Sequence, residues 1–225
     1  MTALVKRSPL SAVYREQCAD VQPIKGWEMA IHFGDLAAEK RALEEGCVLV
    51  DWSHVGKIQI RGRDAADQAE RLRSGAMRLA PLQAIGDDDL AILRLVADEF
   101  LVLCDSGHLD QEIARLEEGS SAICDCSGAL GALLLAGARR DEVIERSAAM
   151  DLSARALGSG GVVQTTLHTI PCTVYRSAVW DLYLQERDYT QSLYDALMDV
   201  GRNVGLVAAG LACVPTNLRA GVNHA

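Results

Sequence analysis

The segment at residues 47–65 constrains the fold more than any other part of the chain. It opens with a short apolar run, Val48-Leu49-Val50, which predicts a buried strand. Residues 58–61 read Ile-Gln-Ile-Arg, the period-2 pattern of a strand with one solvated face. Between them, residues 53–56 read Ser-His-Val-Gly and predict a hairpin turn, in which the glycine is free to take a positive φ. A loop between two packed strands can hold a ligand rigidly. The alternative is a plain hairpin in which His54 only satisfies local hydrogen bonds.

The composition excludes several functional classes. A chain of 225 residues with 49% hydrophobic residues can bury a core in one large domain or two small ones. The net charge of −9 argues against binding to nucleic acid or to anionic membrane surfaces. No apolar run approaches the roughly 20 residues that a membrane span needs, and the N-terminal residues lack the apolar stretch of a signal peptide. We therefore expect a cytoplasmic protein.

The cysteines indicate free thiols rather than a disulfide framework. They are odd in number and dispersed, which is typical of a reducing compartment. Only Cys124 and Cys126 are close together, and they lack a second pair or a histidine at ligand spacing, so the sequence predicts no metal site. The seven positions are Cys18, Cys47, Cys104, Cys124, Cys126, Cys172 and Cys213.

Local patterns predict the other elements of an α+β protein. Asp64 is expected to cap the helix that follows it, and Gly46 and Gly205 are expected to end helices. Helices are predicted over about 10–18, 35–45, 64–74, 109–116, 140–148 and 192–203, with a further helical stretch around 151–153. Strands are predicted over 90–96, 99–106, 129–136, 162–170, 172–176 and 180–184.

Two motifs carry a resemblance to a known family. The strings GWEM…HFG at 26–34 and VDWSHVGKIQIRGRDA at 50–65 resemble the opening of the aminomethyltransferase family, the T-protein of the glycine cleavage system. That family also includes the folate-binding parts of dimethylglycine dehydrogenase and sarcosine oxidase. The resemblance implies a T-protein-like α+β fold of mixed and antiparallel sheets with flanking helices.

The second half of the chain resembles the small gamma subunit of heterotetrameric sarcosine oxidases, a short form that lacks the C-terminal β-barrel domain of the T-protein. We therefore expect residues 1–225 to form a single T-protein-like folate-binding module. Two intertwined subdomains, about 1–125 and 126–210, followed by a short C-terminal tail, are the alternative organisation.

An acidic run at residues 87–89 has two interpretations. Three acids at a turn are usually a solvated loop. The resemblance instead matches Asp88-Asp89-Leu90 to an Asp-Asp-Leu string of the family, in which the second acid faces the folate. It thus implies that Asp88 and Asp89 are catalytic residues and that Asp89 faces the ligand. Transfer of a one-carbon unit moves protons on and off the reacting amines, which a carboxylate can accept and return.

The resemblance also implies a tetrahydrofolate-binding set. Val55 stands where the family has methionine, an apolar replacement. In T-proteins the strand that corresponds to the Tyr175 strand continues into a motif whose glutamate binds the pterin. Here the sequence reads YRSAVWDLYLQ, and Asp181 is the nearest acid that could substitute for that glutamate. The implied set is Trp27, His54, Val55, Tyr175 and Asp181.

Two functions follow from the resemblance. In the first, the chain is the tetrahydrofolate-binding subunit of a multi-component oxidative N-demethylase, and it captures formaldehyde or an iminium as 5,10-methylene-tetrahydrofolate. Its partners would be the oxidase or demethylase subunits of a hetero-oligomeric complex. In the second, it is a non-catalytic scaffold or assembly subunit of an oxidoreductase complex. The Lys-Gly-Cys-x-Gly-Gln-Glu motif of the iron–sulfur-repair branch does not occur in the sequence.

Overall fold

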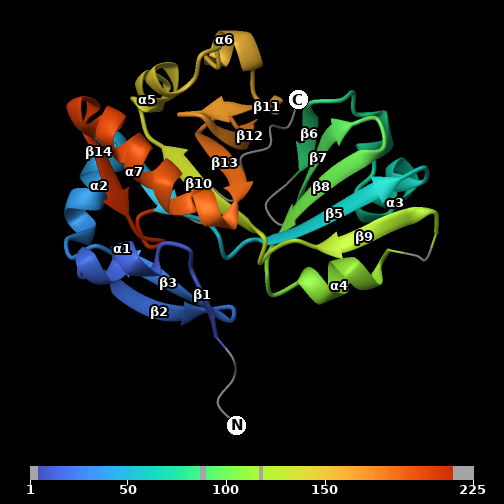
Figure 1. Ribbon diagram of the computed structural model, residues 1–225, viewed down its shortest axis with the longest axis horizontal. Helices are drawn as coiled ribbons and strands as arrows, with labels where there is room; N and C mark the ends of the chain where they lie inside the picture. Colours follow the sequence, from blue (N-terminus) through green and yellow to red (C-terminus); the bar gives the residue numbers. More distant parts are fainter. Residues whose placement is uncertain (1–4, 87–89, 117–118, 215–225) are drawn as a thin grey trace.

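The computed structural model describes residues 5–86, 90–116 and 119–214, which form three β-sheets with helices on their outer sides (Figure 1). The first sheet has the order β1-β3-β2 and comprises β1 (Lys6–Arg7), β2 (Asp20–Ile24) and β3 (Trp27–His32). The second has the order β11-β12-β13-β10-β4-β14 and comprises β4 (Cys47–Asp51), β10 (Leu130–Ala136), β11 (Val162–Leu167), β12 (Ile170–Arg176), β13 (Trp180–Glu186) and β14 (Leu206–Ala209). The third has the order β6-β7-β8-β5-β9 and comprises β5 (Gly56–Gly62), β6 (Gln83–Gly86), β7 (Leu90–Val96), β8 (Glu99–Cys104) and β9 (Ser121–Asp125).

The helices lie outside the sheets and match most of the predicted segments. The third sheet is antiparallel, whereas the first and second each contain one parallel pair, so the expected α+β class with mixed and antiparallel sheets is confirmed. The α-helices are α1 (Ser11–Glu16), α2 (Leu36–Glu45), α3 (Ala65–Leu72), α4 (Leu109–Ala114), α5 (Arg140–Ser147), α6 (Ala154–Leu157) and α7 (Thr190–Gly201). Short 3-10 helices are η1 (Ala76–Arg78), η2 (Arg187–Tyr189) and η3 (Arg202–Val204).

The two strands of segment 47–65 exist, but the predicted hairpin between them is wrong. β4 lies between β10 and β14 in the second sheet, and β5 lies between β8 and β9 in the third. All five residues of β4 are buried, which is typical of a strand in the middle of a sheet covered on both faces. Residues 52–55, called here the crossover turn, therefore carry the chain from one sheet into the other.

The third sheet is an insertion between two neighbouring strands of the second. The chain leaves the second sheet after β4 and returns to it as β10, and these two strands are hydrogen-bonded neighbours in antiparallel register. The pairing extends into the crossover turn, where the Trp52 amide donates to the Ala132 carbonyl at 2.8 Å. The second sheet thus combines segments from both sides of residue 125, the limit in the alternative organisation with two intertwined subdomains.

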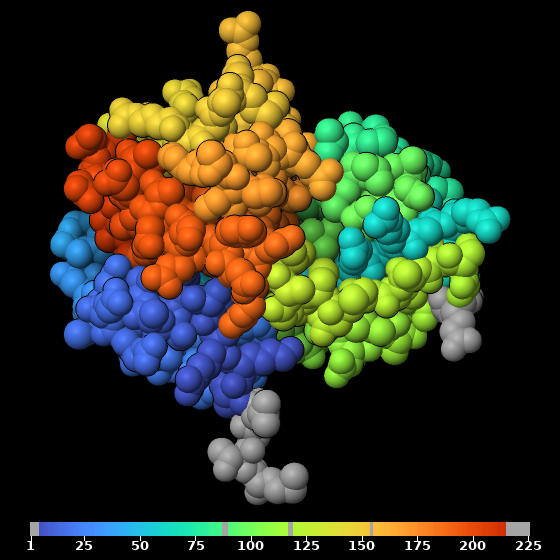
Figure 2. Space-filling model, in the orientation of Figure 1, coloured from blue at the N-terminus to red at the C-terminus, as the bar shows by residue number. Residues whose placement is uncertain are grey.

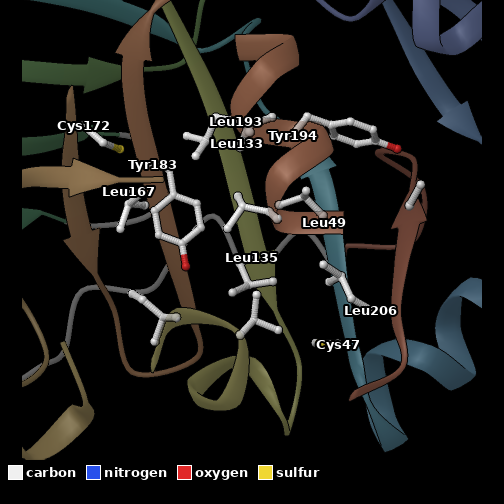
Figure 3. Close-up of a cluster of buried hydrophobic side chains, with 14 of the residues drawn as sticks. Cys47, Leu49, Leu133, Leu135, Leu167, Cys172, Tyr183, Leu193, Tyr194 and Leu206 are labelled. Carbon is white, nitrogen blue, oxygen red and sulfur yellow. The ribbon is translucent and has the colours of Figure 1, made fainter. Parts of the chain in front are cut away.

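The second sheet is the middle layer of the structure, with a hydrophobic core on each face. Figure 3 shows Leu133 and Leu135 of β10 next to Leu49 of β4 and Tyr183 of β13, on the face that α5 and α7 cover. Ala132 and Leu134 belong to the other core, which lies between the second and third sheets. An uninterrupted apolar run was needed at β10 because its alternate side chains enter different cores.

The residues at the ends of helices α2 and α3 agree with the sequence predictions to different extents. Asp35 caps α2 through a hydrogen bond from the Ala38 amide at 3.0 Å, and Gly46 follows its last residue as expected. Asp64 occupies the predicted N-cap position, because α3 begins at Ala65, but its side chain makes no capping hydrogen bond. Its carboxylate accepts instead from the Ser120 amide at 3.0 Å and from the Ser121 hydroxyl.

The strand predicted over residues 162–170 is divided by a turn. β11 ends at Leu167, because His168 and Thr169 adopt positive φ values of 49° and 71° and reverse the chain into β12. Histidine adopts positive φ more often than most residues, but a β-branched threonine rarely does, so the sequence does not predict this turn. Several short strands at sheet edges, among them β6, β9 and β14, were not predicted either.

Replacement of Leu135 by alanine tests the core under α5 and α7. Leu135 is fully buried, so Leu135→Ala should reduce the free energy of unfolding by about 2–5 kcal/mol through lost burial and a residual cavity. Urea denaturation followed by circular dichroism measures it. Val179→Ala, at a position 45% exposed, is the control and should change stability by no more than about 0.5 kcal/mol. Equal effects of the two substitutions would contradict the assigned core.

Candidate functional site

A cavity of about 620 Å³, called here the inter-sheet cavity, lies between the second and third sheets. Its volume is in the range of roughly 300–1,000 Å³ that is common for small-molecule sites. Figure 2 shows the face on which the C-terminal segments of the second sheet, in orange, meet the β5–β9 region in cyan to yellow-green. The cavity is lined by Gln59, Leu95, Leu101, Cys126, Gly128, Ala129, Leu130, Thr173, Leu184, Glu186, Arg187 and Asp188.

The apolar wall of the cavity continues into the core between the two sheets. Leu95, Leu101 and Leu184 belong to both the cavity and that core. Val55, at the end of the crossover turn, packs against the same core. A flat, largely apolar ligand in the cavity would therefore extend the packing that already joins the sheets.

Tyr175 faces the same side of the second sheet as the cavity. It lies two residues from Thr173 on β12 and opposite Leu182 of β13 in the register, and all three side chains point toward the third sheet. Its ring meets that of Trp180 edge-on, with centroids 5.3 Å apart. The hydroxyl is buried and has no hydrogen-bond partner among the residues that the structure describes. Burial raises the pKa of this phenol above its ordinary value of 10.0.

Trp27 reaches the cavity only through a second residue. Its ring is buried at 2% exposure, and the guanidinium of Arg187 lies over it, 6.0 Å from the centroid. Arg187 also donates from Nη2 to the Arg7 carbonyl at 2.6 Å, so two contacts orient this cavity-lining cation. Lys6 Nζ lies 5.4 Å from the centroid of the same ring. The indole therefore supports the cavity wall from behind.

His54 lies in the crossover turn and is almost fully buried. Its ring meets that of Trp52 edge-on at 5.1 Å. The start of the turn is fixed by Asp51, whose carboxylate accepts from the Ser53 amide at 2.8 Å and from the Tyr14 hydroxyl at 2.7 Å. The imidazole is thus held by a buried framework rather than by an exposed loop.

Asp181 lies on the opposite face of the second sheet from Tyr175. It pairs with Arg176 in the register of β12 and β13, and both side chains point toward the helices. Its carboxylate lies 3.7 Å from Arg176 Nε and 3.5 Å from Arg140 Nε. Burial outweighs these cations and raises its pKa to about 6. We therefore leave Asp181 out of the site proposed below.

The two candidate catalytic residues, Asp88 and Asp89, lie outside the described residues. The flanking strands are described: β6 ends at Gly86 and β7 begins at Leu90, and the two pair in antiparallel register. The roles of both acids remain predictions.

Several cavity residues had no signal in the sequence. Gln59 lies on the side of β5 that the alternating pattern predicts to be solvated, and Arg187 with its acidic neighbours follows a strand end. None belongs to a motif, because the lining is contributed by β5, β7, β8, β10, β12, β13 and the loops beside them.

The fold is an α+β domain with a ligand-sized cavity between two of its sheets, and sequence comparison identifies its family. Residues 10–223 match the model of the GCVT N-terminal domain, so the chain belongs to this family. It is 27% identical over 231 residues to an aminomethyltransferase of Geobacillus thermodenitrificans, covering 95% of this chain and 63% of that protein. An aminomethyltransferase of Lysinibacillus sphaericus is also 27% identical, with 96% and 64% covered. The chain thus spans a little under two thirds of the length of these relatives.

Two solved structures share the fold. The glycine cleavage system aminomethyltransferase T from Bartonella henselae superposes with a TM-score of 0.77 at 16% identity, covering 93% of this chain and 60% of that one. A chain of the heterotetrameric sarcosine oxidase from Corynebacterium sp. U-96 superposes with a TM-score of 0.62 at 19% identity, covering 90% of this chain and 97% of that one. Among the described residues, no helix has the length and apolarity required to cross a membrane.

Asp181→Asn tests the environment assigned to this carboxyl. Because its folded-state pKa of about 6 exceeds the ordinary 3.8, the group contributes stability that is full below about pH 4 and is lost as the pH rises through 6. The difference in unfolding free energy, variant minus wild type, should therefore increase between pH 4 and 7 by roughly 3 kcal/mol. Urea denaturation at several pH values measures it. The exposed Asp67→Asn is the control, and a pH-independent difference for Asp181→Asn would refute the assignment.

Proposed function

We propose that this chain binds tetrahydrofolate in the inter-sheet cavity and accepts a one-carbon unit there, as a cytoplasmic subunit of an oxidative N-demethylase. The observation that carries the proposal is the cavity itself, a ligand-sized space beside the core that contains Tyr175 and against which Val55 packs. Membership of the GCVT N-terminal domain family supports a folate as its occupant.

The lining of the cavity suits a folate. The pteridine and benzoyl rings are flat, and leucines from both sheets form its apolar wall. The pterin edge carries N–H donors that pair with a carboxylate. Glu186 lines the cavity and lies two residues beyond Leu184 on the same side of β13. We assign Glu186, rather than Asp181, as the carboxylate that binds this edge.

The proposed reaction needs no redox group in this chain. The carbon of formaldehyde bonds to N5 and N10 of tetrahydrofolate, its oxygen leaves as water, and the two protons of that water come from the two N–H groups. When the carbon arrives as an iminium, the amine leaves with one of the two N–H protons, and the other proton is released and carries the positive charge of the iminium. In both cases protons leave the attacking nitrogens, and Asp89, with Asp88 beside it, would accept and return them.

The supply of the one-carbon unit requires a partner that oxidises an N-methyl group. The fold shared with a chain of a heterotetrameric sarcosine oxidase, over 97% of that chain, supports assembly with such subunits. The second candidate function is a scaffold subunit without a ligand. The position of Asp181 favours it, because the acid expected to replace the pterin-gripping glutamate faces the helices and not the cavity.

Titration with tetrahydrofolate, with and without formaldehyde, tests the proposed site. Wild type should bind with micromolar affinity, and Ala129→Trp should weaken binding by roughly tenfold or more because the indole would occupy the cavity. Ala129 is exposed at the cavity wall, so the core is left intact. Ala122→Trp, exposed on β9 outside the cavity, is the matched control.

The same titration separates the two candidate carboxylates. Glu186→Gln should weaken binding, whereas Asp181→Asn should leave the affinity at the wild-type value. Equal affinities of Ala129→Trp and Ala122→Trp would reject the cavity as the site. Absence of binding both to the isolated chain and to its native complex would favour the scaffold.

Asp89→Ala tests the proposed proton acceptor. Formation of methylene-tetrahydrofolate should slow by about a hundredfold, the usual contribution of a general base. Single-turnover consumption of formaldehyde, with tetrahydrofolate saturating, measures the rate. Asp98→Ala, at the exposed turn between β7 and β8, should keep the wild-type rate. If both variants turn over alike, Asp89 has no part in the reaction.

A further inference from the structure

Lys57 is a charged residue that no part of the proposed chemistry uses, and its side chain has no exposed surface. Lysine is almost never fully buried unless a partner compensates it. Within the described part of the chain, Lys57 enters no ion pair with a carboxylate; its Nζ donates to two backbone carbonyls instead, those of Ser53 and Val55, both at 3.0 Å. Both acceptors belong to the crossover turn.

The backbone of Lys57 is anchored as firmly as its side chain. As part of β5 it stands opposite Leu103 of β8, and its amide donates to Ser127 Oγ at 2.9 Å. Its carbonyl accepts from the Cys126 amide at 2.9 Å. Lys57 therefore connects the crossover turn to the rigid third sheet and to the segment after β9.

Lys57 also lies beside the inter-sheet cavity. Cys126, which donates hydrogen bonds to the Lys57 carbonyl, lines the cavity. Gln59 also lines it and lies two residues further along the same side of β5. The turn that Lys57 holds carries His54, and Val55 packs on the core that forms the cavity wall. A movement of this turn would change the cavity.

We propose that Lys57 is a positioning residue: its buried amine holds the Ser53 and Val55 carbonyls and thereby fixes the crossover turn beside the cavity. The consequence for ligand binding rests on the proposed function, whereas the hold on the turn does not.

The burial of Lys57 and the charges around it determine how opening of the crossover turn depends on pH. Burial lowers its pKa from 10.5 to about 8; Cys126, Asp51 on β4 and Asp125 on β9 oppose that change, and Arg187 on η2 adds to it. An open turn that hydrates the amine returns it to the ordinary pKa. The closed turn therefore binds its proton more weakly than the open turn, and opening becomes less favourable as the pH rises through 8.

Hydrogen exchange of wild type tests this without any ligand or variant. After correction for the intrinsic exchange rate, protection of residues 53–57 relative to β10 should rise roughly tenfold from pH 7 to pH 9. That window lies above the ordinary histidine pKa of about 6.5, and the Cys126 thiol has its pKa raised by burial to about 11. A protection ratio that does not change with pH overturns the proposal.

Lys57→Met supplies the matched variant, because methionine has a similar shape but no donor. Protection of the turn should fall and lose its pH dependence, and the affinity for tetrahydrofolate should fall roughly tenfold as the turn becomes free to move. Lys40→Met, on the exposed side of α2, should behave as wild type in both measurements.

A failure of the proposed function and a failure of the inference about Lys57 give different results in these two measurements. If wild type binds no tetrahydrofolate, the proposed function fails, and exchange still decides whether Lys57 holds the turn. If tetrahydrofolate binds but Lys57→Met exchanges as wild type does, the inference about Lys57 is overturned and the folate site stands. Should Lys57→Met not fold, the pH profile of wild type decides alone.

Discussion

The pairing of β4 with β10 is the contact on which the rest of the structure depends. The chain leaves the second sheet through one of these strands and returns through the other, so their hydrogen bonds bring together the two ends of the inserted third sheet. The third sheet is thereby stacked on the second, and the inter-sheet cavity is the space that the stacked faces leave unfilled. Burial of β4 on both faces stabilises this arrangement, because a largely apolar strand at an edge would expose its backbone and side chains.

The sequence predicts most of the elements and misses how they pair. Periodicity indicates that residues 58–61 are extended with one inward face, yet it contains no information on which strand lies alongside. A turn between two predicted strands favours a hairpin, and only the remote partners β8, β9, β10 and β14 exclude it. Asp64 fails as a cap for a related reason: a hydroxyl 57 positions away, that of Ser121, occupies its carboxylate. Local patterns are reliable until a distant group competes for the same atom.

The same limit applies to the site. The resemblance points to Val55 and Tyr175, and both lie against the core that borders the cavity. It also pointed to Asp181, which is close to Tyr175 in sequence but on the other face. Side chains alternate along a strand, and a turn separates β12 from β13, so only the register Tyr175–Leu182 fixes the relative faces. Glu186, whose side chain reaches the cavity, becomes visible as a candidate only once that register is known.

Lys57 and Asp181 show what a buried charge can and cannot indicate. Asp181 lies between two arginines, and such networks often serve no purpose that an apolar set could not serve as well. Lys57 has no such partner among the described residues, and the displacement of its pKa from 10.5 to about 8 corresponds to roughly 3 kcal/mol against the charged form. A methionine would avoid that penalty but would leave the Ser53 and Val55 carbonyls without a donor where two sheets meet. Since no backbone amide of the described residues donates to the Ser53 and Val55 carbonyls, a long side chain with several donors is the local solution. The presence of a lysine there is therefore explained by the geometry of the turn rather than by the stability of the sheet.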